Sequence, residues 1–176
     1  MKRIVLAITG ASGVCYSKRL FDCIKSKAET HVIISDRGAE LLNLELGITA
    51  SYFSGKHVTL HKTTRMNSSI ASGSFCVDAM VVVPASMGTL GRISAGTSGT
   101  LIERVADVMQ HGDKRCLNAW HTMPYFATPI SNPIKGKLNF KSQSHEIRTI
   151  TDVDEHTFLF HLAQDSILGG ANFKLD

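Results

Sequence analysis

The 176-residue sequence lacks several patterns that would place it in a common class of protein. No apolar run reaches the ~20 residues of a membrane span, and no charged region with a long apolar stretch marks a secretory signal. The four cysteines form no CxxC pair or metal-ligand spacing, which favours reduced packing residues in a cytoplasmic protein without a metal site. The net charge of +4 comes without a basic run, so nucleic acid is not an expected partner.

Apolar residues make up 43% of the chain, enough for one domain over residues 1–176 with a sizeable core. Continuous apolar runs at residues 3–9, 30–35 and 79–84, and a weaker one at 116–120, predict strands covered on both faces. Helical spacing follows the first two strands and recurs at residues 101–110. This alternation predicts a Rossmann-like three-layer α/β sandwich with a parallel sheet and a flavodoxin-like topology.

Two further regions carry weaker signals. Residues 47–75 are polar and rich in serine and threonine, which predicts a long, partly ordered connection of the kind that often lines a site. Residues 125–148 show no clear periodicity and contain breaking prolines, and a final helix is expected over residues 153–168.

The first predicted strand ends in the turn TGASG, where Gly10 and Gly13 allow close approach of a ligand to the backbone and the Ser12 hydroxyl can bind a phosphate oxygen. The turn lacks the third glycine of the dinucleotide fingerprint and the Gly-Lys-Ser/Thr of a Walker loop. A phosphate site and a merely tight turn both remain open. A second such loop follows the strand at residues 79–84, where Ser86 and Thr89 begin a helix and offer a second anion cradle.

Four segments together resemble the flavin prenyltransferases of the UbiX type. They are ITGASG, SGSF at residues 72–75, MVVVPASMGTL and LIERVADV. The resemblance covers residues 2–108, with the motifs in the family's order and spacing. It implies a Rossmann-like fold, FMN in its reduced form as a substrate, and a trimer-based homododecamer. It also implies transfer of a dimethylallyl group from dimethylallyl monophosphate to FMN, whose prenylated product serves a partner aromatic-acid decarboxylase, as in ubiquinone synthesis.

The resemblance also implies roles for single residues. The positions expected to hold the flavin nucleotide and its phosphate are Gly10, Ala11, Ser12, Ser35, Ser86, Met87, Thr89 and Arg104. Ser12, Glu45 and Arg104 match active-site positions of the family, and Ser72 and Gly73 match a loop against the flavin ring and the prenyl donor. From the residues alone, the favoured interpretation of Glu45 is a solvated helix residue. For Arg104 the alternative is a pairing with Glu103 or Asp107 on its own helix.

Beyond Val108 the sequence departs from the family. The nearest alignment places His111 where the family has a lysine, and His121 and Thr122 where it has an Arg-Glu pair. Histidine lacks the charge and the bidentate fork of arginine, so His121 is a weakened candidate for the donor phosphate. The flavin half of the site is therefore expected to be intact and the donor half altered.

Two alternatives stay open. The altered donor half suits an FMN-binding carrier or regulatory subunit without transferase activity. A flavin-dependent decarboxylase, as in another branch of the superfamily, would need an active-site histidine, and the candidates by composition are His57, His61, His111 and His121.

Overall fold

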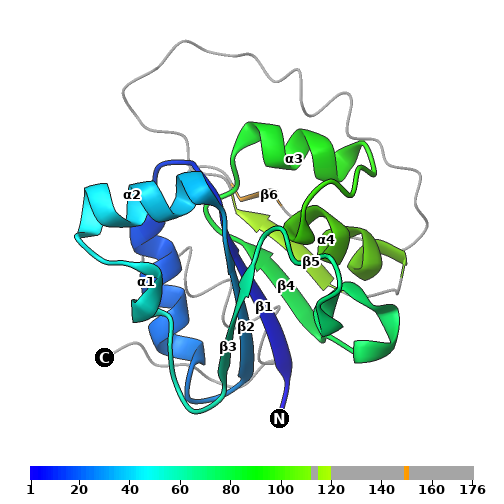
Figure 1. Ribbon diagram of the computed structural model, residues 1–176, viewed down its shortest axis with the longest axis horizontal. Coiled ribbons are helices and arrows are strands. Elements are labelled where there is room, and N and C mark those ends of the chain that lie inside the picture. The colour runs from blue at the N-terminus through cyan, green and yellow to red at the C-terminus, as the bar shows by residue number, and fades with distance from the viewer. Residues whose placement is uncertain (112–114, 120–148, 151–176) are drawn as a thin grey trace.

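The computed structural model describes residues 1–111, 115–119 and 149–150. Within them, a single parallel sheet has the strand order β3-β2-β1-β4-β5-β6. Its strands are β1 (Arg3–Ile8), β2 (Glu29–Ile34), β3 (Val58–Lys62), β4 (Ala79–Val82), β5 (Arg115–Ala119) and β6 (Thr149–Ile150). The strand order reverses between β1 and β4, as in doubly wound sheets, and the expected Rossmann-like class is confirmed (Figure 1).

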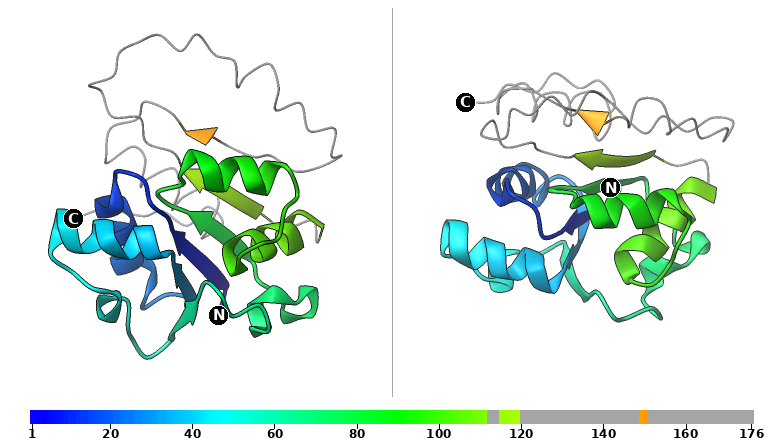
Figure 2. Two further views of the ribbon diagram at one scale, coloured as in Figure 1. Left: turned by 45° about the horizontal axis from the view of Figure 1, so that its top comes forward. Right: turned by 90° about the horizontal axis from the view of Figure 1, so that it is seen from above.

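Helices cover both faces of this sheet, as the views in Figure 2 show. One face carries α1 (Val14–Ile24) and α2 (Asp36–Leu46). The other carries α4 (Leu101–His111), with α3 (Met87–Ser94) beside it and the short 3-10 turns η2 (Ser69–Ala71) and η3 (Gly73–Phe75). A further 3-10 turn, η1 (Ala50–Tyr52), follows α2. No helix in the described part of the chain is both long and apolar enough to cross a membrane.

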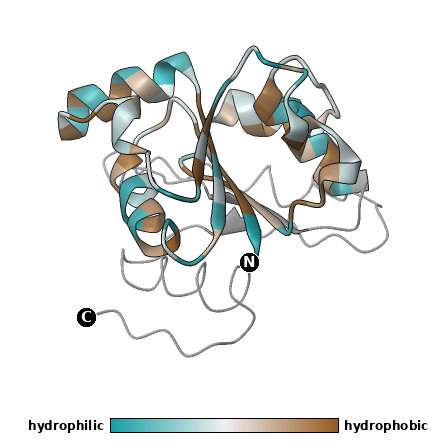
Figure 3. Ribbon diagram, turned by 60° about the horizontal axis from the view of Figure 1, so that its bottom comes forward, coloured by the Kyte–Doolittle hydropathy of each residue, from teal (hydrophilic) through white to brown (hydrophobic). Residues whose placement is uncertain are grey.

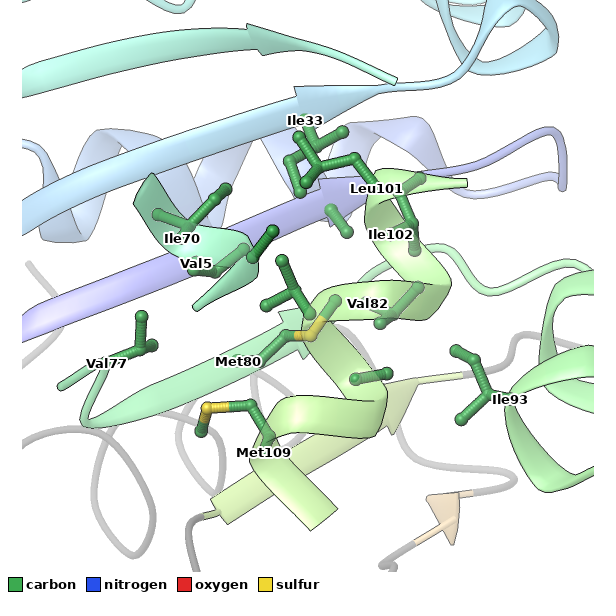
Figure 4. Packing of buried hydrophobic residues seen from close by; sticks show 14 of the residues in the cluster. Val5, Ile33, Ile70, Val77, Met80, Val82, Ile93, Leu101, Ile102 and Met109 are labelled. Atoms are coloured by element: carbon green, nitrogen blue, oxygen red, sulfur yellow. The ribbon is translucent and has the colours of Figure 1, made fainter. Parts of the chain in front are cut away.

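The two core clusters explain why the strands read as unbroken apolar runs. Along β1, alternate residues point to opposite faces, so Ile4, Leu6 and Ile8 pack under α1 and α2. Val5 and Ala7 pack on the other side with α4 and η2, the cluster shown in Figure 4. Figure 3 shows the same contrast as hydrophobic central strands beside helices of mixed hydropathy.

The helices begin and end largely where the spacing predicts. In α1 the buried residues are Val14, Ser17, Leu20, Phe21 and Ile24, the stripe that the sequence indicates. The Ser35 hydroxyl caps α2 by accepting a hydrogen bond from Gly38 N at 3.0 Å. The predicted strand at 116–120 corresponds to β5.

The expectation for residues 47–75 is wrong at one place, because residues 58–62 form the edge strand β3. Its residues Thr59, Leu60 and Lys62 are exposed, so the segment lacks the apolar run that marks a doubly covered strand. The irregular stretch at 125–148 and the helix expected at 153–168 lie outside the described residues.

Candidate phosphate site

Three loops that carry hydroxyl groups meet at one edge of the sheet. They follow the neighbouring strands β2, β1 and β4, and because these strands are parallel their carboxyl ends share that edge. The loops hold Ser35, the turn from Gly10 to Gly13, and Ser86. Each leads into a helix, whose first amides have no partner inside the helix. The edge therefore presents hydroxyls and free N–H groups to an anion.

The turn after β1 leaves the start of α1 open to such a ligand. Gly13 adopts a left-handed conformation with φ of 98°, which explains glycine at this position. Within the described residues no side chain caps α1, and its first turn holds no acidic residue. Half-buried Ser12 and Ala11 lie at the same turn. An anion bound here would supply the acceptor that a capping side chain supplies elsewhere.

The other two loops carry capped helices. Ser35 accepts from Gly38 N and keeps its own hydroxyl proton to donate. The Ser86 hydroxyl lies 2.9 Å from the Thr89 hydroxyl and accepts from Thr89 N at 3.3 Å. Met87, the first residue of α3, is exposed beside them. These hydroxyls are thus preorganised at helix N-termini, the arrangement predicted from the sequence.

Thr9 joins two of the loops, a role that the sequence analysis missed. Its buried hydroxyl donates to the Pro84 carbonyl at 2.7 Å and accepts from Ser86 N at 2.7 Å. The backbone N–H of Thr9 also donates to Pro84 O at 3.2 Å. This clamp fixes the turn after β1 against the loop after β4. The pairs span 75 and 77 residues of sequence, so no local pattern indicates them.

Gly10 packs closely against the start of α2. A Cβ atom at this position would lie 2.4 Å from Cβ of Arg37, closer than two carbon atoms can approach. The Arg37 side chain itself is 80% exposed and pairs with Glu40 on the surface. Glycine at position 10 therefore brings the loop after β1 within reach of the loop after β2.

Arg104 belongs to the same edge through α4. Leu101 N donates to the carbonyl of Thr63, the residue that follows β3, so α4 begins at the carboxyl ends of the strands. The Arg104 guanidinium is 43% exposed and donates to Asp107 at 2.9 Å. Such surface pairs on one helix contribute only about 0.3–0.5 kcal/mol. Arg104 can therefore exchange Asp107 for a phosphate at little cost.

Glu103, by contrast, is buried and structural. It lies 1% exposed and accepts hydrogen bonds from Gly99 N, Thr100 N and the Arg92 side chain. With the weaker bond from Glu103 N to the Thr100 hydroxyl, this is a capping box at the start of α4. The spacing Thr-x-x-Glu before an apolar stripe is the signal that indicates it in the sequence.

The remaining predicted residues are not brought to this edge within one chain. Ser72 and Gly73 are exposed at the start of η3, and a Cβ on Gly73 would meet Val108, about 10 Å along α4 from its start. Glu45 is exposed in the last turn of α2, about 15 Å along that helix from Ser35. His121 lies outside the described residues, as does the side chain of His111.

Comparison with known proteins agrees with this geometry. Residues 1–137 match the Flavoprotein family. The flavin prenyltransferase UbiX of Methanocaldococcus jannaschii is 36% identical over 76% of this chain and 72% of its own length. The UbiX prenyltransferase of Chlamydia pneumoniae is 40% identical over 61% of this chain, which spans only 59% of that relative.

Two solved structures show the same fold. AnUbiX (PadA1), solved in complex with FMN and dimethylallyl pyrophosphate, has a TM-score of 0.65 at 32% identity, over 70% of this chain and 66% of its own. A dodecameric FMN-dependent UbiX-like decarboxylase from Escherichia coli O157:H7 has a TM-score of 0.66 at 29% identity, over 69% of this chain and 67% of its own. This chain is thus a member of the Flavoprotein family, in its group of UbiX flavin prenyltransferases.

Proposed function

We propose that this protein transfers a dimethylallyl group from dimethylallyl monophosphate to reduced FMN. The observation that carries the proposal is the phosphate site, where three hydroxyl-bearing loops and the uncapped N-terminus of α1 meet. These groups fit the phosphate of FMN, which would be held by Gly10, Ala11, Ser12, Ser35, Ser86, Met87 and Thr89. The relatives named flavin prenyltransferases, and the neighbour solved with FMN and a dimethylallyl compound, support the same reaction.

In this reaction the allylic C–O bond of the donor breaks as a bond forms to N5 of the reduced flavin, N5 loses its proton, and inorganic phosphate leaves. The π bond of the transferred group then takes up a proton at one carbon and bonds to C6 at the other, as C6 gives up its proton. The flavin supplies the nucleophile, so the protein has to stabilise the departing negative charge. Arg104 is the candidate that the resemblance assigns to this role, and its weak pairing with Asp107 leaves it able to bind the phosphate. We assign Ser12 and Glu45 to proton movement, and His121 to the donor phosphate.

The distant placement of Ser72, Gly73 and Glu45 bears on assembly. All three are exposed and lie away from the phosphate site of their own chain, so a neighbouring copy is the direct way to bring them to it. The similar protein from Escherichia coli is dodecameric. We infer a homo-oligomer built on trimers, in the cytoplasm, whose prenylated FMN is passed to a decarboxylase of aromatic acids.

The direct test uses the purified full chain under anaerobic conditions. Reduced FMN and dimethylallyl monophosphate are added, and the flavin is then analysed by absorption and mass. We expect a flavin heavier by one dimethylallyl group, with release of one inorganic phosphate per product.

Binding of FMN without product over several allylic donors would contradict the transferase and leave the carrier or regulatory role. In that case the double variant His121→Arg, Thr122→Glu tests whether the altered donor half is the reason. Loss of CO2 from an added acid, without any donor, would instead show a flavin-dependent decarboxylase.

The Thr9 clamp gives a sharper prediction for the flavin half. Thr9→Val keeps the shape of the side chain but leaves Ser86 N without its acceptor, at a cost of about 1–3 kcal/mol. We expect roughly tenfold weaker FMN binding by fluorescence titration, because the turn after β1 is no longer held in place against the loop after β4. Thr9→Ser keeps the hydroxyl and is the matched control. Equal FMN affinities for the two variants would contradict the idea that the Thr9 hydroxyl positions these loops for FMN.

A further inference from the structure

A chain of polar side chains crosses the sheet face that α4 covers, outside the phosphate site. The Ser68 hydroxyl lies 2.8 Å from Nδ1 of His61, and Nε2 of His61 lies 2.9 Å from Nδ1 of His31. Nε2 of His31 is buried and lies 3.4 Å from a carboxylate oxygen of Glu29. The other oxygen of Glu29 accepts from Arg3 Nε at 3.0 Å. The chain thus links β3, β2 and β1 to the start of η2.

The same chain returns to the far end of the segment that begins at Ser68. Arg3 Nη1 donates to the Phe75 carbonyl at 2.8 Å, and its guanidinium lies 4.8 Å from the centre of the Phe75 ring. That ring meets His31 edge-on, with 5.2 Å between ring centres. Both ends of residues 68–75 are therefore tied to one polar chain, which we call the histidine clamp: Arg3, Glu29, His31, His61 and Ser68.

Between these two ties the segment is only partly anchored. Ile70 packs into the core beside Val5 and Ile33 (Figure 4), and Ala71 is also buried. Residues 72–74 are exposed. The geometry of the exposed part is therefore set by the core contact on one side and the clamp at its ends.

The surroundings fix where the protons lie in the clamp. A carboxylate facing Nε2 of His31 favours a proton on that nitrogen, so Nδ1 of His31 is an acceptor. His61 must then donate from Nε2, which leaves its own Nδ1 to accept from the Ser68 hydroxyl. With both rings neutral, the Ser68–His61 and His61–His31 links each have one donor and one acceptor, and the Ser68 hydroxyl can turn to accept if one ring gains a proton. With both rings protonated, two N–H groups would face each other.

From this arrangement we propose that His31 and His61 are positioning residues, which hold residues 72–74 in the shape that meets the prenyl donor and the flavin ring. The proposal rests on the proposed function, because Ser72 and Gly73 are assigned there to substrate binding. Neither histidine touches the phosphate site, so the clamp acts on the loop rather than on the chemistry.

Burial favours the neutral form of both rings. Burial is the main cause that lowers the pKa of His61, to about 4, and the neighbouring His31 and Arg65 lower it further. Burial also lowers the pKa of His31, against the opposing pull of Glu29 and with a smaller contribution from Arg3. If the clamp opened, the pKa of each histidine would return to its ordinary value of about 6.5. Opening therefore takes up protons and becomes easier as the pH falls from about 6.5 toward about 4.

Hydrogen exchange of the full chain tests the clamp without relying on activity. In His61→Phe, which keeps a ring but removes both hydrogen bonds, we expect the amides of residues 68–75 to exchange about tenfold faster. The amides of residues 10–13 and 86–90 should be unchanged. His57→Phe is the matched control, since His57 is exposed in the turn just before the same strand.

Should His61→Phe fail to fold, Ser68→Ala removes only the outer link, with Ser69→Ala at the exposed neighbouring position as its control. In the wild type, protection of residues 68–75 should fall between about pH 6.5 and about pH 4, corrected for intrinsic exchange rates. His61→Phe should weaken this pH dependence, because one of the two titrating rings is gone. Nitrogen NMR should show both rings neutral at pH 7, with the proton on Nε2.

The kinetic readout separates positioning from general damage. We expect His61→Phe to raise KM for dimethylallyl monophosphate about fivefold, while the Kd for FMN stays within about twofold. Unchanged exchange in both clamp variants would overturn the inference even if the wild type is an active transferase. A wild type without transferase activity would overturn the proposed function, whereas the exchange result would still report on the clamp.

Discussion

Replacing Glu103 by alanine is expected to lower the free energy of unfolding by about 2–4 kcal/mol. The carboxylate is 1% exposed and accepts from Gly99 N at 2.8 Å and Thr100 N at 2.9 Å. Alanine leaves both amides at the start of α4 without an acceptor and removes the capping box. Arg92 adds less to this cost, because its side chain is 52% exposed and water can solvate the freed guanidinium.

The measurement is urea unfolding followed by circular dichroism, with equal m-values as the condition for comparing the variants. Glu40→Ala is the matched control, because Glu40 is 60% exposed and pairs only with the exposed Arg37 in the described structure. We expect its cost to stay below about 0.5 kcal/mol. Glu103→Gln keeps an acceptor oxygen and should lie between the two. Equal losses for Glu103→Ala and Glu40→Ala would show that the buried carboxylate does not anchor α4.

Three of the strands that the sequence predicted, β1, β2 and β4, have both faces covered. In β1, β2 and β4 alternate residues enter opposite core clusters, so the whole run has to be apolar. Among the described strands, β3 lies at the edge and pairs with β2 alone, and it exposes Thr59, Leu60 and Lys62. It therefore carries neither an apolar run nor a clear alternation, which is why the sequence indicates a connection there instead of a strand.

In the candidate site, too, the features set by neighbouring residues could be predicted, whereas those that join residues far apart in the sequence could not. Ser35 and Ser86 could be predicted as caps because a cap is a property of a few consecutive residues. The clamp from Thr9 to Ser86 and the network from Ser68 to Glu29 join residues that meet only in the folded sheet. Their partners are fixed by strand order and register, which one sequence does not state.

The placement of Ser72 and Glu45 shows a further limit. The resemblance assigns both to the active site, yet in one chain Glu45 lies in the last turn of α2, and Gly73, next to Ser72, lies beside Val108 well along α4 from its start. A match of motifs predicts that residues act together. It does not tell whether they come from one chain or from several chains of an oligomer. That question depends on surfaces, and the exposed Leu44 beside Glu45 marks one such surface.

Gly38→Ala is expected to destabilise the fold by about 1–3 kcal/mol and to weaken FMN binding roughly tenfold. Gly38 is buried in the first turn of α2, and a Cβ there would lie 2.7 Å from the Ile8 carbonyl oxygen and 3.2 Å from the Ser35 hydroxyl. The end of β1 is fixed in the core, so α2 has to move away from it. That movement carries Ser35 with it, because Ser35 N donates to the same Ile8 oxygen at 2.9 Å.

The matched control is Gly91→Ala, in the exposed part of α3. Within the described part of the chain, no atom outside the local helix backbone lies within 4 Å of a Cβ at this position, so we expect alanine to gain helix propensity and to stabilise the protein by about 0.5–1 kcal/mol. The same substitution should therefore change stability in opposite directions at the two glycines. Urea unfolding and FMN titration of both variants decide the point. If Gly38→Ala also gains stability or keeps its FMN affinity, the close approach of α2 to β1 does not position Ser35 for the phosphate.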